Sequence, residues 1–275
     1  MRYPTRLRPG FYFLESKSSM FRKFRVVILL LILATVALGA WRANNRLTAW
    51  EHTIHVGIYP IAGDSSPSTA QFIRDFNTDS VADIAEWMQE QTRNFEIAVL
   101  QPVSFQIAPR ISEQPPLPPK NPSALDAAIW SMKIRWWAWK HDEISGPKPH
   151  IRLYVIFHDA QQNSQLAHSV GLGKGQIGLI HVFASRKQGR QNAVVITHEL
   201  LHIFGASDKY DLSNLQPIFP QGYAEPEKTP RLPQTFAEIM AGRTPISETQ
   251  AKIPASLTET VVGHETAVEI GWIKK

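Results

Sequence analysis

The residues from Thr197 to Asp208 include the side chains best suited to chemistry in this chain. His198 and His202 are four residues apart, which places both imidazoles on one face of a helix, where they can bind one metal ion. Glu199 lies between them and can act as a general base on a water held by that metal. This spacing predicts hydrolysis assisted by Zn²⁺, with a peptide bond as the typical substrate.

The residues around these three side chains predict a buried helix. Its apolar members occupy nearly every side of the helix: Ala193, Val194, Val195, Ile196, Leu200, Leu201, Ile203 and Phe204. A helix that is apolar nearly all round is normally buried. The alternative is a core helix whose histidines only satisfy hydrogen bonds, but two histidines and a glutamate are costly to bury without partners or a metal.

The third metal ligand is expected just after the helix. Gly205 predicts a left-handed helix end, after which the chain can turn back sharply. Asp208 lies three residues further on and can complete a set of two imidazoles and one carboxylate, leaving a fourth zinc position for water. A solvated loop aspartate is the alternative interpretation. Other carboxylates compete for the ligand role, namely Asp211, Glu225 and Glu238.

The stretch resembles the metzincin clan of zinc metallopeptidases, whose signature is H-E-x-x-H-x-x-G-x-x-H/D. It is most similar to the variant with aspartate as third ligand, as in the small snapalysin-type enzymes. The resemblance implies a methionine in a tight turn beneath the metal, and Met240, followed by Gly242, is the candidate. An ordinary core methionine is the alternative. The similarity covers the motif helix, its turn and Met240, and no specific metzincin family can be assigned.

The expected mechanism uses the zinc-bound water as nucleophile. Glu199 would take the proton of this water and return it to the leaving amine. Such sites often add a donor for the developing oxyanion, and Tyr210 and Tyr223 are the nearby candidates, with packing as their alternative role. Two other functions stay open: a non-catalytic, zincin-like envelope scaffold or binding domain, and a zinc amidase acting on cell-wall peptides.

Composition and charge exclude several classes of protein. The chain has 275 residues and no cysteine, which rules out disulfides and thiolate metal sites. Residues 1–25 hold seven basic residues against Glu15 alone, a net charge of +6, so the remaining 250 residues carry −1 of the total of +5. The basic character therefore belongs to the N-terminal tail, and nucleic acid is not an expected partner. The expected partner is a peptide or protein substrate, and the sequence gives no indication of an oligomeric state.

The N-terminal region predicts a single-pass membrane anchor. Residues 26–41 form an uncharged, apolar run of 16 residues, and flanking arginines can extend it to bilayer length by snorkelling. The basic residues before the run place residues 1–25 in the cytoplasm and residues 43–275 outside, in the periplasm if the source is Gram-negative. A cleaved signal peptide and a buried core helix are the alternatives. Residues 42–53 are expected to form a polar linker.

Residues 54–275 are expected to form one catalytic domain. Strands are predicted at 54–59, ending at Pro60, at 95–108, at 151–157 and at 177–183. Helical spacing of apolar residues predicts helices at 69–92, with a break near Asn77, and at 123–139. Turns or a final helix are expected at 256–270. Proline-rich loops fill 109–122 and 211–233. This order predicts an α+β domain, with a mixed twisted sheet and the motif helix beneath it, which agrees with the metzincin resemblance.

Two further features of this domain need an interpretation. The predicted helix at 123–139 is rich in tryptophan, with Trp130, Trp136, Trp137 and Trp139. Packing against the sheet is the favoured interpretation, and contact with a membrane or a glycan is the alternative. The glycine-rich run 171–175 lacks the ending of a phosphate-binding loop. We expect Gly173 and the strand that contains Ile177 to form an edge that pairs with an extended substrate.

Overall fold

The computed structural model describes residues 15–119, 123–172 and 175–274 of the chain. Residues 1–45 and 46–275 form two separate units. Helix α1 (Glu15–Ala49) carries most of the first unit, and residues 1–14 of the predicted basic tail lie outside the described residues. Among the described residues, we find no helix with the length and apolar character needed to cross a bilayer. The membrane segment expected at 26–41 stays a prediction.

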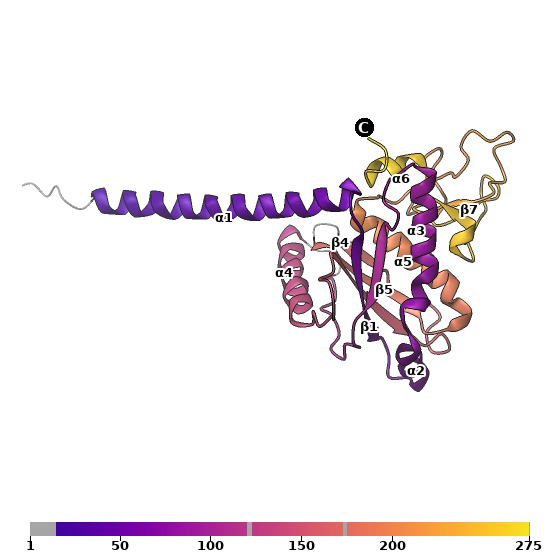
Figure 1. Ribbon diagram of the computed structural model, residues 1–275, viewed down its shortest axis with the longest axis horizontal. Helices are drawn as coiled ribbons and strands as arrows, with labels where there is room; N and C mark the ends of the chain where they lie inside the picture. The colour runs from indigo at the N-terminus through magenta and orange to yellow at the C-terminus, as the bar shows by residue number, and fades with distance from the viewer. Residues whose placement is uncertain (1–14, 120–122, 173–174, 275) are drawn as a thin grey trace, which may run out of the picture. The chain divides into compact units, whose positions relative to one another are not determined.

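A five-stranded sheet forms the centre of the second unit (Figure 1). Its strand order is β2-β1-β3-β5-β4. Four strands run parallel to one another: β1 (Ile54–Ala62), β2 (Val103–Ile107), β3 (Ile151–His158) and β5 (Ile177–Phe183). Strand β4 (Val170–Leu172) pairs antiparallel with β5 and forms one edge. The predicted mixed sheet is therefore confirmed.

Helices cover both faces of this sheet, which explains why its central strands are almost continuously apolar. One face packs against α2 (Pro67–Asp75), α3 (Ala82–Asn94) and α5 (Gly189–Phe204), and α4 (Ala124–Lys140) covers the other (Figure 1). A hydrophobic core lies on each face of the sheet, and alternate residues of β3 point into one or the other. Leu153 and Val155 pack in the core on the α5 side, and Tyr154 and Ile156 pack in the core on the α4 side. The sheet thus holds α5, which carries the motif, against a rigid layer.

The C-terminal part of the chain adds short elements near α5. They are β6 (Ala237–Glu238), β7 (Thr244–Pro245), β8 (Ala251–Lys252), β9 (Thr260–Val261) and α6 (His264–Glu269). Short 3₁₀ turns lie at Thr78–Val81, Arg186–Gln188 and Leu257–Glu259. The predicted break in the helix at Asn77 is confirmed, since Asn77 caps the first of these turns with its side chain.

Three predicted boundaries are wrong. Strand β1 continues through Pro60, which has no N–H to donate but whose carbonyl accepts a bond from Ile111 N at 3.0 Å. The strand expected at 95–108 is only Val103–Ile107. The linker expected at 42–53 includes two core residues, Leu47 and Trp50. The Trp50 indole donates to Ile270 O at 2.7 Å, so residues 46–53 are part of the folded unit.

Helix α4 begins where predicted but packs differently from the expectation. Ser123 and Asp126 form a reciprocal capping box at its start. Trp137 is 3% exposed and packs in the core, as expected. Trp136 and Trp139 are 63% and 75% exposed, so the interpretation that all four tryptophans pack against the sheet is wrong for these two.

Candidate metal centre

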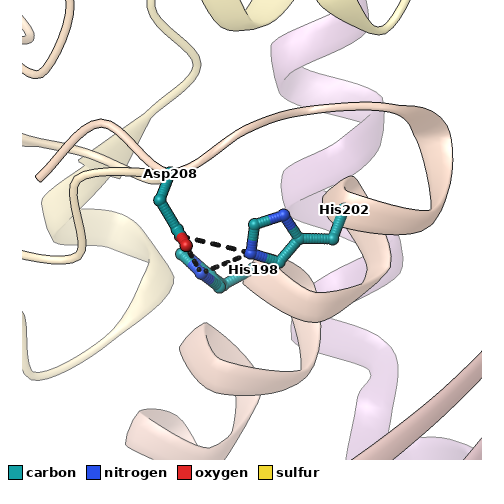
Figure 2. A group of neighbouring side chains, drawn as sticks. All are labelled: His198, His202 and Asp208. Atoms are coloured by element: carbon teal, nitrogen blue, oxygen red, sulfur yellow. Dashed lines mark hydrogen bonds and ion pairs between the residues drawn. The ribbon is translucent and has the colours of Figure 1, made fainter. Parts of the chain in front are cut away.

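Three side chains from the predicted motif converge on one point (Figure 2). His198 Nε2 and His202 Nε2 are 3.1 Å apart. Asp208 Oδ1 lies 3.1 Å from the first nitrogen and 3.2 Å from the second. The three potential ligand atoms thus form a nearly equilateral triangle, with one member of the set supplied by the loop that follows α5.

The backbone fixes the orientation of both imidazoles. His198 Nδ1 lies 3.0 Å from Ile239 O, and His202 Nδ1 lies 2.8 Å from Ala206 O. A carbonyl can only accept, so each Nδ1 donates its hydrogen there, and each ring in its neutral form would offer Nε2 as a metal ligand. Backbone carbonyls commonly orient metal-binding histidines in this way. The two Nε2 atoms and the Asp208 Oδ1 atom lie close enough together to bind one metal ion.

The triangle fits a tetrahedral zinc ion. Bonds of about 2.0–2.1 Å imply ligand separations of about 3.3 Å at tetrahedral angles, close to the three observed distances. Two imidazoles and one carboxylate are also a donor set that zinc accepts. The side chains of His198 and His202 keep 16% and 20% of their surface exposed, so a fourth position can reach solvent. Such an open position distinguishes catalytic from structural zinc sites.

The electrostatics of the triad favour an ionised Asp208. Burial raises the pKa of the Asp208 carboxyl, but hydrogen bonds from His198 and His202 outweigh burial and bring that pKa well below its usual range. Burial lowers the pKa of His202, whereas the hydrogen bond with Asp208 raises it, and the net direction is upward. Each group therefore stabilises the opposite charge on the other, and a metal ion bound here would replace the proton on His202 Nε2.

Glu199 lies beside the triad on α5 and is only 8% exposed. Burial raises the pKa of its carboxyl, and the neighbouring His198 and His202 offset part of that rise. Its Oε2 atom is buried and has no hydrogen-bond partner among the described residues. A buried, unpartnered carboxylate oxygen next to three converging ligand atoms is a position suited to binding a reacting water.

The turn after α5 explains how Asp208 reaches the histidines. Gly205 ends the helix with a φ of +113°, a left-handed conformation that favours glycine, so the predicted turn is confirmed. Lys209, directly after Asp208, is buried and pairs with Glu269 Oε2 at 2.6 Å. Its ammonium also donates to Ser207 O at 2.9 Å. These contacts of Lys209 fix the loop on both sides of Asp208. No pattern in the sequence predicted this ion pair.

The competing carboxylates are occupied elsewhere. Asp211 accepts hydrogen bonds from Ser213, and Glu225 accepts from the backbone of Thr235 at 2.6 Å. Glu238 is fully buried and accepts from Thr266 Oγ1 at 2.7 Å. Only Asp208 of the four candidates lies with the histidines.

Met240 lies in a tight turn that contacts the site through its backbone. Ala241 N donates to Glu238 O at 3.0 Å, and Gly242 follows with a φ of +66°. The turn supports the triad from two sides, because Ile239 O orients His198 and Met240 O accepts from Lys209 N at 3.0 Å. The metzincin resemblance implies such a turn, and the role of Met240 as its methionine stays a prediction.

The two tyrosine candidates differ in their surroundings. Burial, with a further contribution from the nearby Asp208 carboxylate, raises the pKa of the Tyr210 phenol. Tyr223 is buried against Phe219, with ring centroids 5.2 Å apart. The structure therefore places Tyr210 at the site, and gives Tyr223 a packing contact.

The strand beside α5 is not the predicted one. Ile177 lies in β5, which β4 covers, so Ile177 is buried and is not part of an edge. The edge strand is β4, whose Gly171 packs directly on α5: a Cβ at this position would lie 2.8 Å from His202 Cβ and 3.0 Å from Glu199 O. Gly173 lies outside the described residues. The glycine-rich composition indicated that this segment lies near the site, but it did not predict that Gly171 packs against His202 and Glu199.

Comparison with known proteins assigns no relative. No protein-family model matches the chain, and no curated protein sequence matches it either. The interpretation of the site therefore rests on its geometry.

Proposed function

We propose that this chain is a metzincin-like zinc metallopeptidase that hydrolyses peptide bonds. The observation that carries the proposal is the convergence of His198 Nε2, His202 Nε2 and Asp208 Oδ1 beside the unpartnered Oε2 of Glu199. His198, His202 and Asp208 would hold Zn²⁺. When bound there, the ion would acidify a water and polarise the scissile carbonyl.

The remaining steps belong to side chains of this chain. Glu199 would take a proton from the attacking water and deliver it to the leaving amine. Its raised pKa supports this role, because a carboxyl closer to neutrality can both accept and return a proton. The Tyr210 hydroxyl, whose pKa is raised in part by Asp208, is the nearest candidate for a donor to the developing oxyanion.

We also propose where the substrate backbone would bind. Strand β4 is the edge of the sheet next to α5, and its outer side offers unpaired backbone groups to an extended peptide. The chain would be held at a membrane by residues 26–41, with residues 46–275 outside the cytoplasm. A protein or peptide in that compartment would be the substrate.

Glu199→Gln separates an enzyme from a binding domain. We expect this variant to retain about one zinc per chain and to lose peptide hydrolysis, because the amide keeps the shape of the side chain but cannot accept the proton. His202→Ala should lose both zinc and activity. Unchanged cleavage by Glu199→Gln would contradict the assigned base. Product analysis on proteins and on cell-wall peptides then separates a peptidase from an amidase.

A further inference from the structure

Helix α4 carries an exposed apolar face that the proposed active site does not use. Its members recur at steps of four and three residues, which aligns them on one side of the helix: Leu125, Ile129, Met132, Trp136 and Trp139. Met132 and Trp139 are 67% and 75% exposed. We call these five residues the α4 stripe.

The opposite side of the same helix is already buried. Ile134, Trp137 and Ala138 pack against the sheet, and the Trp130 indole donates to Pro116 O at 2.9 Å. Helix α4 is thus apolar on two opposite sides, although one side suffices to hold it to the domain. A surface helix normally presents polar residues to water, so a second apolar side marks an interaction surface.

Basic residues border the α4 stripe. A projection at about 100° per residue places Lys133 and Lys140 along one side of the stripe and Arg135 along the other. The only acidic residue of α4 is Asp126, which caps the start of the helix. Lys140 contacts Glu113 at 2.9 Å, but both side chains are about half exposed, and such surface pairs are weak.

We propose that the α4 stripe docks in the interfacial layer of an anionic lipid bilayer. Tryptophans that combine an apolar ring with a polar N–H favour that layer, and long basic side chains can reach lipid phosphates from its edge. A second copy of the stripe would instead bring Lys133, Arg135 and Lys140 towards the same cations, which is unfavourable. The charge pattern therefore fits lipid headgroups better than a paired helix.

The proposal rests on the membrane anchoring proposed above, which would tether the folded unit to the bilayer. Residues 41 and 46 are five backbone steps apart, so the chain between the predicted span and the folded unit can reach at most about 18 Å. A tether this short makes the local concentration of lipid high, and a modest apolar face then suffices for stable docking. Docking would hold the catalytic domain against the bilayer.

The absence of cysteine allows a direct test with single labels. The full chain is reconstituted in nanodiscs containing phosphatidylglycerol, with one nitroxide at Met132→Cys, Trp139→Cys or the control Leu212→Cys, which is 79% exposed on another segment. Collision with oxygen and with a water-soluble nickel chelate is measured by electron paramagnetic resonance. We expect the ratio of oxygen to nickel collisions to be several-fold higher at residues 132 and 139 than at 212.

Two further arms make each outcome decisive. Trp136→Glu in the Met132→Cys background should bring the ratio down to that of Leu212→Cys. A fourth label, Leu33→Cys, reports on the anchor alone: lipid contact at 33 without lipid contact at 132 and 139 overturns docking and leaves the anchor standing. Equal nickel collision at 132, 139 and 212 also overturns it. So does spin–spin broadening at 132 that disappears on dilution with unlabelled chain, which would identify a second copy as the occupant.

Discussion

Replacing Gly171 with alanine should disturb the candidate metal centre through packing alone. The added Cβ would lie 2.8 Å from His202 Cβ and 3.0 Å from Glu199 O, where about 3.5–4.0 Å is comfortable for carbon. Neither neighbour is the flexible end of a side chain, so β4 or α5 must shift by roughly 0.5–1 Å. Metal ligands tolerate about 0.2 Å, so the shift exceeds what the site can absorb.

Two quantities follow from this displacement. Overpacking of this kind costs about 1–3 kcal/mol of unfolding free energy, which lowers the melting temperature by about 2–4 °C per kcal/mol in a domain of this size. Displaced ligands should weaken zinc binding by about 10–100-fold, the range that loss of supporting contacts produces. Calorimetric unfolding and competition with a chelator measure the two effects on the full chain.

The matched control is Gly175→Ala, in the same glycine-rich segment. Its Cβ would meet nothing closer than 3.6 Å, so packing should be unaffected. If Gly171→Ala binds zinc and unfolds like Gly175→Ala, the close packing of β4 on α5 does not support the site, and the reasoning fails.

Three other changes have defined outcomes. Asp208→Asn should weaken zinc binding by at least about 10-fold relative to the control Asp211→Asn, because only Asp208 of the two contacts the histidines. Equal zinc affinities of the two variants would show that Asp208 is not a ligand. Glu238→Ala should lower the free energy of unfolding by about 2–5 kcal/mol, because buried donors, including Thr266 Oγ1, lose their acceptor. Denaturant unfolding measures this loss, and a loss under about 1 kcal/mol would contradict the prediction. Burial lowers the pKa of His181 in the folded protein to about 4. As the pH falls from about 6.5 towards 4, His181 is therefore protonated in the unfolded chain before it is protonated in the folded protein, so the free energy of unfolding should fall over this range. His181→Gln should flatten that fall relative to the parent, and an unchanged slope would show that His181 does not cause it.

The sequence predicted those parts of the fold that depend on local pattern. Periodicity identified β3 and β5, and the left-handed turn at Gly205 followed from glycine itself. Spacing likewise predicted that His198 and His202 share a helix face, which the structure shows. These features need only the residues within a turn or a strand.

Long-range contacts were beyond the sequence. Whether Trp137 or Trp139 faces the core depends on which side of α4 meets the sheet, and both sides are apolar. The antiparallel return of β4 onto β5 moved the edge away from Ile177. Lys209 and Glu269 are 60 residues apart, and only the folded loop brings them together. Each of these outcomes was decided by tertiary packing.

The zinc content of the full chain tests the central claim most directly. The chain is stripped of metal, reloaded with zinc and freed of excess, and the parent is compared with His202→Ala. The account predicts about one zinc per chain in the parent and almost none in the variant, because the triad loses one of its three ligand atoms. Equal zinc in both, or no zinc in the parent, would contradict it.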